Sequence, residues 1–275
     1  MQPTRLSFAF CFLGAFSCAS AGAAPPVAGW SPATKWNVDY QPNKCVAARN
    51  YANGKAEAAI GFEARPMKKE LTTIVQVAGI TRDITYGIKG KARFAGREEA
   101  LQHVIAAPSK RFGRTLYSFV IHREAVEALG PSGQFGFEVR GVQLLLPLTD
   151  MPTVMNAMDE CVADLVESWG MSREAQARMA SPPAPAKGRT MFDADDYPDS
   201  ALTFGKIGEV QALVQVRADG SVGECRIANS SGHDDIDMAT CHSIRKRARF
   251  DPARDHGGKP MDAPFLLPVN WNISG

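Results

Sequence analysis

The sequence lacks the motifs that mark most enzymes. Its 275 residues contain no Gly-x-Ser-x-Gly elbow, phosphate-binding glycine loop, His-Glu-x-x-His pair or dinucleotide fingerprint. The five histidines are scattered, and the acidic residues that follow His233 are typical of a helix start, where carboxylates oppose the positive end of the helix dipole. We therefore expect a protein that is not an enzyme, with no catalytic residue, no cofactor and no metal ligand.

A strong charge of one sign is also missing. Lys and Arg number 31 against 29 Asp and Glu, which gives a net charge of +2, and no basic face is interleaved with aromatic residues. This composition argues against a nucleic-acid partner. The most basic run is Arg245, Lys246, Arg247 and Arg249. We interpret it as the solvated end of a helix, with contact to anionic lipid or peptidoglycan as the alternative.

The chain begins with an apolar stretch that is too short to span a membrane. Leu6–Phe16 follows Arg5 and has about 11 residues, whereas a membrane-spanning helix needs about 20. Small residues at Ala19–Ala21 or Ala21–Ala23 fit a cleavage site. We expect residues 1–23 to be a cleaved signal peptide that directs the protein to the periplasm. Retention of this segment would instead anchor the protein in the inner membrane, and only then do we expect membrane contact.

Cysteine is sparse, and no Cys-x-x-Cys pair of the kind that binds zinc is present. Removal of the signal peptide leaves Cys45, Cys161, Cys225 and Cys241, which allow three pairings. In an exported chain we expect disulfides. We favour Cys225 with Cys241, because the first lies on a predicted strand and the second on the helix that should cover it. Cys45 with Cys161 would tie the start of the first domain to its last helix.

The middle of the chain predicts a β-rich domain. After an extended segment over residues 24–35, residues 36–170 contain several runs rich in β-branched residues with partial alternation, which favours a meander of strands. A short helix is expected at His122–Leu129, and a longer one at Pro152–Trp169, where an apolar stripe recurs at helical spacing. Residues 171–192 read as a linker rich in Pro and Ala.

The final segment, residues 193–275, predicts a β-β-α-β unit. Val210–Val216 alternates between apolar and polar residues, Asp219-Gly220 supplies a tight turn, and Ser221–Ala228 returns as a second strand. A helix then begins after Ser230-Ser231-Gly232, and Phe265–Ile273 is the last strand. The whole chain is therefore expected to be of the α+β class.

Five features of this last segment occur in the order typical of one family. They are Tyr197-Pro198 with Ala201, the hairpin at Ala218-Asp219-Gly220, Ser230-Ser231-Gly232, Ile236-Asp237 with Ala239, and Arg249-Phe250-Asp251-Pro252-Ala253. Together they resemble the TonB C-terminal domain family over about 30% of the chain. The preceding domain is similar to uncharacterised exported domains that come before TonB-like C-termini.

The resemblance implies a partner at the cell envelope. TonB C-terminal domains hold an extended segment of an outer-membrane transporter against an exposed sheet edge. We therefore expect an envelope protein or peptide as partner, such as an outer-membrane transporter segment, bound by strand addition. The candidate edge strand carries Phe265, Leu266, Leu267, Val269, Asn270 and Trp271. Pro264 and Pro268 suit an edge, since they cannot donate to a ladder, although prolines can also protect an edge from pairing.

Two other functions stay open. One is an anchored energy transducer of the TonB type, although the short proline segment and the intervening domain differ from the long spacer of such proteins. The other is an envelope enzyme or ligand-binding protein whose site lies in residues 36–170.

Overall fold

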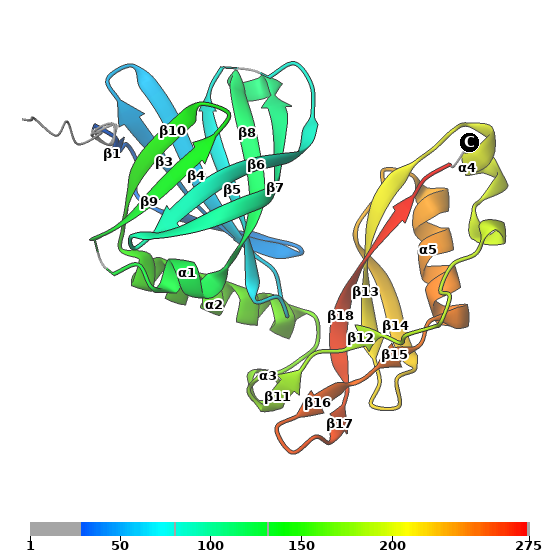
Figure 1. The fold of residues 1–275 in the computed structure, drawn as a ribbon. Helices are drawn as coiled ribbons and strands as arrows, with labels where there is room; N and C mark the ends of the chain where they lie inside the picture. Colours follow the sequence, from blue (N-terminus) through cyan, green and yellow to red (C-terminus); the bar gives the residue numbers. More distant parts are fainter. Residues whose placement is uncertain (1–28, 80, 131, 274–275) are drawn as a thin grey trace, which may run out of the picture.

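The computed structural model describes residues 29–79, 81–130 and 132–273 (Figure 1). It is a mixed, strand-rich α+β structure whose described residues form one large sheet, a three-stranded sheet near the end of the chain, and two minor sheets of short strands. The expected signal peptide lies outside the described residues. Within the described ranges, no helix combines the length and the apolar character needed to cross a bilayer.

Ten strands form the large sheet in the order β1-β3-β4-β5-β8-β7-β6-β9-β10, with β2 paired to β3. Neighbouring strands are antiparallel throughout. The strands are β1 Ser31–Pro32, β2 Asn37–Gln41, β3 Lys44–Asn53, β4 Ala56–Ala64, β5 Glu70–Ala78, β6 Thr85–Phe94, β7 Arg97–Ser109, β8 Arg114–His122, β9 Ser132–Val139 and β10 Val142–Thr149. A 3-10 turn, η1 Lys110–Phe112, joins β7 to β8, and α1 Arg123–Glu127 follows β8.

This sheet curls around its own core until its two ends approach each other (Figure 1). The Tyr51 hydroxyl on β3 donates a 2.9 Å hydrogen bond to the Pro147 carbonyl on β10. The Trp36 indole N–H donates one of 2.9 Å to the carbonyl of Thr149 at the end of β10. Alternate side chains of each strand point inward, as expected for a sheet with one buried face. The largest fully buried ones here include Tyr51, Phe62, Phe94 and Phe135.

The order of the strands differs from the expected meander in two places, since β5 pairs with β8 and β9 pairs with β6. β5 pairs with β8, because the chain crosses over the ends of β8 and β7 before it forms β6. One of the β-branched runs in this domain predicts a strand at residues 80–88, of which residue 80 lies outside the described residues, and the observed strand β6 is Thr85–Phe94. The 13-residue β7 was not expected. β7 alternates poorly in sequence, since it carries Glu98, Glu99 and His103 among its apolar residues. Its pairing depends on the neighbouring strands and not on its own pattern.

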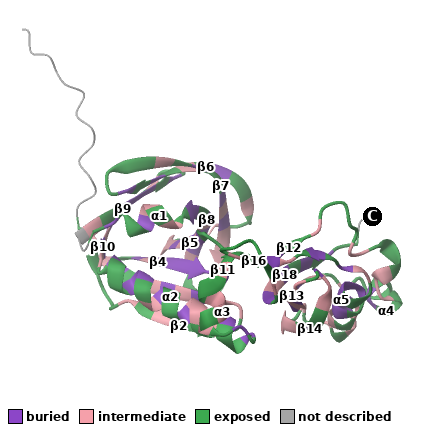
Figure 2. Cartoon of the chain, turned by 90° about the horizontal axis from the view of Figure 1, so that it is seen from below, coloured by how far each residue is buried: buried purple, intermediate pink, exposed green. Residues whose placement is uncertain are grey.

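Helix α2, Met151–Ser168, follows β10 and packs against β2 and β3. It buries Met151, Val154, Met155, Met158, Cys161 and Val166 (Figure 2). Val154, Met158 and Cys161 belong to the apolar stripe expected from sequence, whereas Val162 and Leu165 of that stripe are only half-buried. Cys161 is bonded to Cys45 at the start of β3, so both members of this expected pair lie at disulfide distance.

Residues 171–192, expected as a linker, contain regular structure that pairs with the end of the chain. Helix α3 spans Arg173–Arg178, and the Ser172 hydroxyl accepts a hydrogen bond from the Ala175 N–H at its start. Strand β11, Met179–Ser181, pairs with β16, Ala253–Asp255. Strand β12, Ala184–Pro185, pairs with β15, Phe250–Asp251. The proline-rich stretch is extended, as its composition predicts, but it runs along other strands.

The last part of the chain folds as a three-stranded sheet covered by one helix. Its elements are η2 Ala194–Asp196, α4 Asp199–Thr203, β13 Gly208–Val216, β14 Val222–Asn229, α5 Asp234–Arg247, β17 Pro260–Met261 and β18 Ala263–Trp271. The strand order is β14-β13-β18. The observed succession of β13, β14, α5 and β18 follows the expected β-β-α-β pattern, with three short strands inserted between α5 and β18.

The turn between β13 and β14 requires glycine. Gly220 has a φ of 79°, and a Cβ atom placed on it would lie 2.2 Å from the Phe250 carbonyl oxygen. The Phe250 N–H also donates to the Gly220 carbonyl at 3.0 Å. The Asp219-Gly220 pair therefore does more than close a hairpin, since it also seats the segment that follows α5.

Candidate functional site

The candidate site is built on the central strand β13. Its alternation in sequence places Val210, Ala212, Val214 and Val216 toward α5, where all four are buried. β13 pairs with β14 on one side and with β18 on the other. With a partner on each edge, β13 has no backbone group left for another strand.

Strand β18 lies at the edge of this sheet. It pairs with β13 over nine consecutive positions, from Gly208 opposite Trp271 to Val216 opposite Ala263. Within the described ranges, no strand pairs with its other side. The predicted edge residues are all on this strand: Leu267, Val269 and Trp271 are buried, Asn270 is exposed, and Phe265 and Leu266 are half-buried.

The end of β18 is fixed by a cluster around Trp271. The Trp271 ring makes edge contacts with Tyr197 and Phe192, with ring centroids 5.1 and 5.6 Å away. Its indole N–H donates a 2.9 Å hydrogen bond to the Thr240 hydroxyl, which is fully buried on α5 and donates in turn to the Ile236 carbonyl at 2.8 Å. Buried polar groups of this kind are stabilising only when each finds a partner. Here the Trp271 indole N–H and the Thr240 hydroxyl each have a hydrogen-bond partner.

Sequence reasoning assigned no role to Thr240 as a partner of Trp271, or to Phe192. The Tyr197-Pro198 element of the family pattern was the available signal for Tyr197. Its hydroxyl donates to the Lys206 carbonyl at 2.6 Å, which holds the segment before β13 against Trp271. The motif therefore positions the chain beside the end of β18.

Helix α5 is joined covalently to the sheet. Cys225 on β14 and Cys241 on α5 lie at disulfide distance, as expected from their places on strand and helix. The Arg245 guanidinium donates a 2.6 Å hydrogen bond to the Cys225 carbonyl. Arg247 makes ion pairs with Asp193 and Asp196. Two of the four residues in the basic run thus hold neighbouring segments, and the run is not a wholly solvated helix end.

The start of α5 carries the acidic residues expected there. The Asp235 carboxylate accepts hydrogen bonds from the Lys206 ammonium at 2.7 Å and from the Ser200 hydroxyl at 2.6 Å. The bond from Lys206, followed by the one from Ser200, lowers the pKa of Asp235 from 3.8 to about 2. These contacts link α4, and the segment just before β13, to the start of α5. In the part of the chain that the structure describes, no group of three His, Cys, Asp or Glu side chains is arranged to hold a metal ion.

The face of the sheet opposite α5 is covered in part by the preceding elements. Leu213 on β13 is buried in a cluster with Val166, Trp169 and Met171, against which Leu266 of β18 also packs. Gln215 donates a hydrogen bond to the Trp169 carbonyl, and the Asn43 side chain donates one to Gln211. The end of α2 and the turn between β2 and β3 therefore contact β13 directly.

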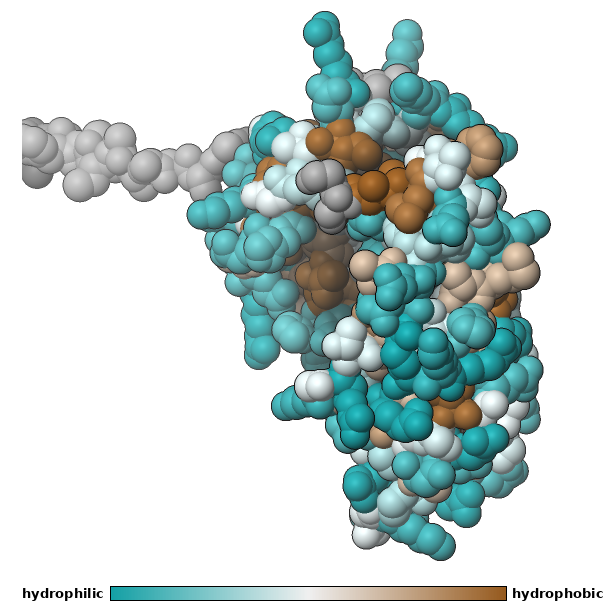
Figure 3. All heavy atoms as spheres, turned by 90° about the vertical axis from the view of Figure 1, so that its right-hand side faces the viewer, coloured by the Kyte–Doolittle hydropathy of each residue, from teal (hydrophilic) through white to brown (hydrophobic). Residues whose placement is uncertain are grey.

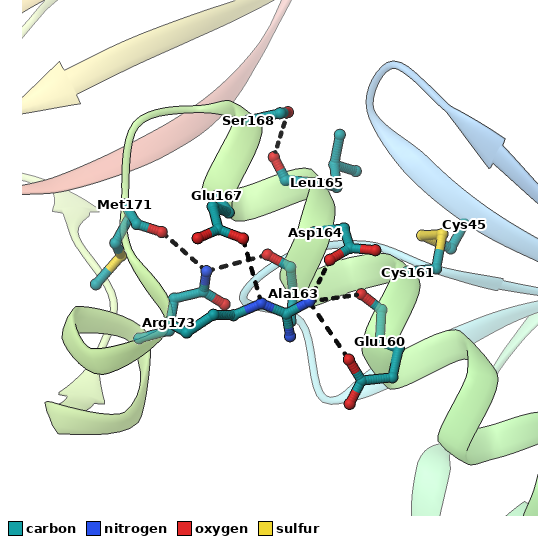
Figure 4. A network of polar contacts seen from close by, with 11 residues as sticks. Cys45, Glu160, Cys161, Ala163, Asp164, Leu165, Glu167, Ser168, Met171 and Arg173 are labelled. Carbon is teal, nitrogen blue, oxygen red and sulfur yellow. Dashed lines mark hydrogen bonds and ion pairs between the residues drawn. A yellow bond between two sulfur atoms is a disulfide. The ribbon is translucent and has the colours of Figure 1, made fainter.

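The turn from α2 into α3 is held by a polar network (Figure 4). Arg173 makes ion pairs with Glu160, Asp164 and Glu167, which lie along α2. The Gln176 side-chain amide donates to the carbonyls of Ala163 and Met171, at 3.0 and 2.9 Å. These contacts set the direction in which the chain leaves α2 for the small sheet.

Two hollows lie away from the β18 edge. One, of about 1030 Å³, runs along α5, with Asp234 and Asp237 toward the start of the helix and Arg245 and Lys246 toward its end. Figure 3 shows that this side of the molecule is largely hydrophilic, with apolar surface gathered toward its upper end. The other hollow, of about 350 Å³, opens where β7 separates from β8. The hollow between β7 and β8 lies within residues 36–170, the segment in which a ligand site was the alternative expectation.

Comparison with known proteins places the last part of the chain in a family. Residues 193–273 match the family described as Gram-negative bacterial TonB protein C-terminal. A protein of Pseudomonas aeruginosa named Protein tonB2 is 33% identical over 81 residues, which cover 30% of this chain and 29% of the relative. The match begins at η2 and ends after β18, so it includes the sheet, α5 and the Trp271 cluster except Phe192. Residues 193–273 of this protein are a TonB C-terminal domain.

Proposed function

We propose that this protein is a periplasmic binding protein whose TonB C-terminal domain captures an extended segment of an envelope protein. The segment would lie beside β18 as a fourth strand of the sheet β14-β13-β18. The observation that carries the proposal is the position of β18, which pairs with β13 on one side only among the described residues. Strand addition needs a row of free backbone N–H and C=O groups, and the outer side of an edge strand supplies them.

The two prolines of β18 support an edge that can accept a partner. Pro264 and Pro268 lie opposite Gln215 and Gln211, four positions apart, so their backbone groups point in the same direction. Because proline has no N–H, these positions suit the outward side, while the intervening residues bond to β13. Leu266 and Asn270 have the same parity and would point their N–H groups outward. The outer edge would therefore offer two donors and four carbonyl acceptors.

Burial along β18 shows which side chains lie on which face of the sheet. Leu267, Val269 and Trp271 are buried under α5, whereas Pro268 and Asn270 are exposed. A partner strand beside β18 would place alternate side chains over the α5 face and over the opposite face. On the opposite face it would approach the sheet where Trp169 and Leu266 already pack. The N-terminal part of the chain would then contribute to which side chains fit.

The covalent structure favours an exported protein. Both cysteine pairs lie at disulfide distance, and such bonds persist in oxidising compartments such as the periplasm. The segments recognised by TonB C-terminal domains belong to outer-membrane transporters, which reach this compartment. We infer that the partner is a transporter segment of this kind, bound without chemical change.

Asn270→Pro in the full exported protein is the direct test. It removes an outward N–H, and the exposed side chain leaves the core untouched. With synthetic peptides from the periplasmic segments of outer-membrane transporters, we expect affinity up to about ten-fold lower by titration calorimetry, because one hydrogen bond to the peptide is lost.

Asn270→Val is the matched control, since it changes the same side chain but keeps the N–H, and it should bind as the wild type does. Equal affinities for the proline and valine variants would overturn strand addition at β18. Thermal unfolding of both variants shows whether the fold is retained. Val269→Pro is less suitable, because the Val269 N–H would face β13 and its loss would disrupt the sheet itself.

A further inference from the structure

The N-terminal sheet carries a second surface whose composition points to a different kind of partner. At the end opposite α2, the loop from β5 to β6 crosses beside the η1 turn between β7 and β8 (Figure 1). Within these segments, Arg82, Ile84, Tyr86, Lys110, Arg111 and Phe112 are all exposed. We call these six residues the loop-end surface.

The strand register brings the two segments together. Ala78 at the end of β5 and Ser109 at the end of β7 both lie opposite Arg114, the first residue of β8. The Thr81 N–H donates a 2.9 Å hydrogen bond to the Thr115 hydroxyl on β8, which donates in turn to the Gly79 carbonyl at 2.8 Å. These bonds fix the start of the crossing loop to β8, directly beside η1.

The apolar members are unusually exposed for their size. Ile84, Tyr86 and Phe112 have 54%, 71% and 59% of their surface accessible, and they are three of the ten large apolar side chains exposed in the described residues. Single exposed apolar residues are ordinary on a protein surface. Three of them close together at one end of a sheet, on the loop before β6, at the start of β6 and on η1, mark a contact surface.

The charged members are almost all positive. Residues 81–86 and 110–113 contain Arg82, Lys110 and Arg111 against a single carboxylate, Asp83. None of the three cations takes part in an ion pair with another described residue. The Arg111 guanidinium lies over the Phe112 ring, 5.4 Å from its centroid. Cations beside exposed aromatic and aliphatic side chains suit the boundary between lipid headgroups and acyl chains.

We propose that the loop-end surface docks this protein onto an anionic phospholipid bilayer. The three cations would contact lipid phosphates, while Ile84, Tyr86 and Phe112 would enter the interfacial layer. A soluble polyanion would need the cations but not the apolar side chains. A second copy of the chain would bring like charges together. The surface lies at the opposite end of the large sheet from α2, the helix that leads to the TonB C-terminal domain, so docking leaves β18 open to its partner.

The test is sedimentation of the purified full chain with vesicles, comparing phosphatidylcholine vesicles that contain phosphatidylglycerol with pure phosphatidylcholine vesicles. We expect binding to the anionic vesicles only, weakened by added salt. The triple variant Arg82→Gln/Lys110→Gln/Arg111→Gln should bind on the order of 100-fold more weakly, since each cation near an anionic surface contributes about five-fold. Ile84→Ser/Tyr86→Ser/Phe112→Ser should also lose binding, although its charge is unchanged.

Matched controls lie elsewhere on the same sheet. Lys68 and Lys69 are exposed on the loop between β4 and β5, and Tyr40 is 59% exposed on β2. Lys68→Gln/Lys69→Gln and Tyr40→Ser should bind anionic vesicles as the wild type does, and circular dichroism of every variant reports whether the fold is kept. Three results would overturn the proposal: no binding to anionic vesicles, equal loss in the control variants, or retained binding in the apolar triple variant.

Discussion

The two sheets of this protein differ in what lies beside their edge strands. The large sheet curls until β3 and β10 meet, and Tyr51, Arg49 and Trp36 bind Pro147 and Thr149 across the seam. The small sheet has three strands, and among the described residues β14 and β18 each pair on one side only. Within the described ranges, strand β10 pairs only with β9, so the seam is made by side chains and not by a backbone ladder. It still brings the two ends of the large sheet against each other, whereas an open edge is the device by which a sheet binds an extended chain.

The comparison explains why the smaller unit is the one we assign to partner capture. Three strands under one helix bury little surface, and a free edge must be kept available without loss of the fold. The small sheet is reinforced by the Cys225–Cys241 bond, by the Trp271 cluster and by strands β11 and β12 from the preceding segment. An open edge is tolerated because the support comes from the helix face and from the ends of the strands.

Removing either disulfide should give the largest effect on stability, and it tests whether the two sheets are stabilised separately. In the chain-entropy account, the Cys45–Cys161 bond spans 116 residues and contributes about 4–5 kcal/mol, and the Cys225–Cys241 bond spans 16 and contributes about 3 kcal/mol. We expect Cys45→Ser/Cys161→Ser to speed amide hydrogen exchange mainly in β3 to β10, and Cys225→Ser/Cys241→Ser to speed it mainly in β13, β14 and β18. The same response of both sheets to both variants would contradict independent stabilisation.

The hydroxyl of Tyr51 is a single group whose removal tests the contact between β3 and β10. Tyr51→Phe removes the bond to Pro147, and we expect a loss of about 1 kcal/mol in urea unfolding at neutral pH. Burial raises the pKa of Tyr51 to about 12, from 10.0, against smaller opposing effects of Arg49. Its contribution to stability is therefore complete below pH 10 and is lost as the pH rises toward 12. If the phenylalanine variant loses as much stability as the wild type between these pH values, this assignment is wrong.

A smaller effect is expected at the start of α5. The lowered pKa of Asp235 means that the contribution of its carboxylate is present above pH 3.8 and is lost as the pH falls to about 2. We expect Asp235→Asn to lower the melting temperature at neutral pH, with the difference from wild type shrinking through the acid range. Asp234→Asn, one residue earlier in the same turn, is the control, and an equal shift in both variants would count against the Lys206 and Ser200 contacts.

Much of the small sheet could be predicted from sequence because its signals are local. The alternation of Val210–Val216, the Asp219-Gly220 turn and the acidic start of α5 each act within a few residues, and each is observed where expected. The large sheet was harder to predict. β7 has a mixed pattern, and β5 pairs with β8 instead of with the strand that follows it in the chain. Pairings of this kind depend on contacts between distant residues, which a local pattern does not encode.

Some features of the candidate edge strand β18 could also be predicted from sequence, and others could not. The prolines at 264 and 268 indicate an edge strand in sequence alone, since a strand with a partner on each side needs every N–H. The contacts of Trp271 with Phe192 and Thr240 join residues 79 and 31 positions apart and could not be read from any pattern. The loop-end surface also could not be predicted from sequence. Ile84 and Phe112 come close together only because β8 pairs with β5.

Local sequence signals predict the strands and the helix of the C-terminal domain, and its motifs carry the family resemblance. The places of the cysteines on strand and helix indicate which of them pair. Three features follow only from the folded chain: residues 171–192 pair with the end of the chain, the large sheet meets itself at Tyr51 and Pro147, and β18 pairs on one side only among the described residues. Propensity, periodicity and capping act over a few neighbouring residues, whereas pairing, closure and exposure are settled by which distant surfaces bury one another.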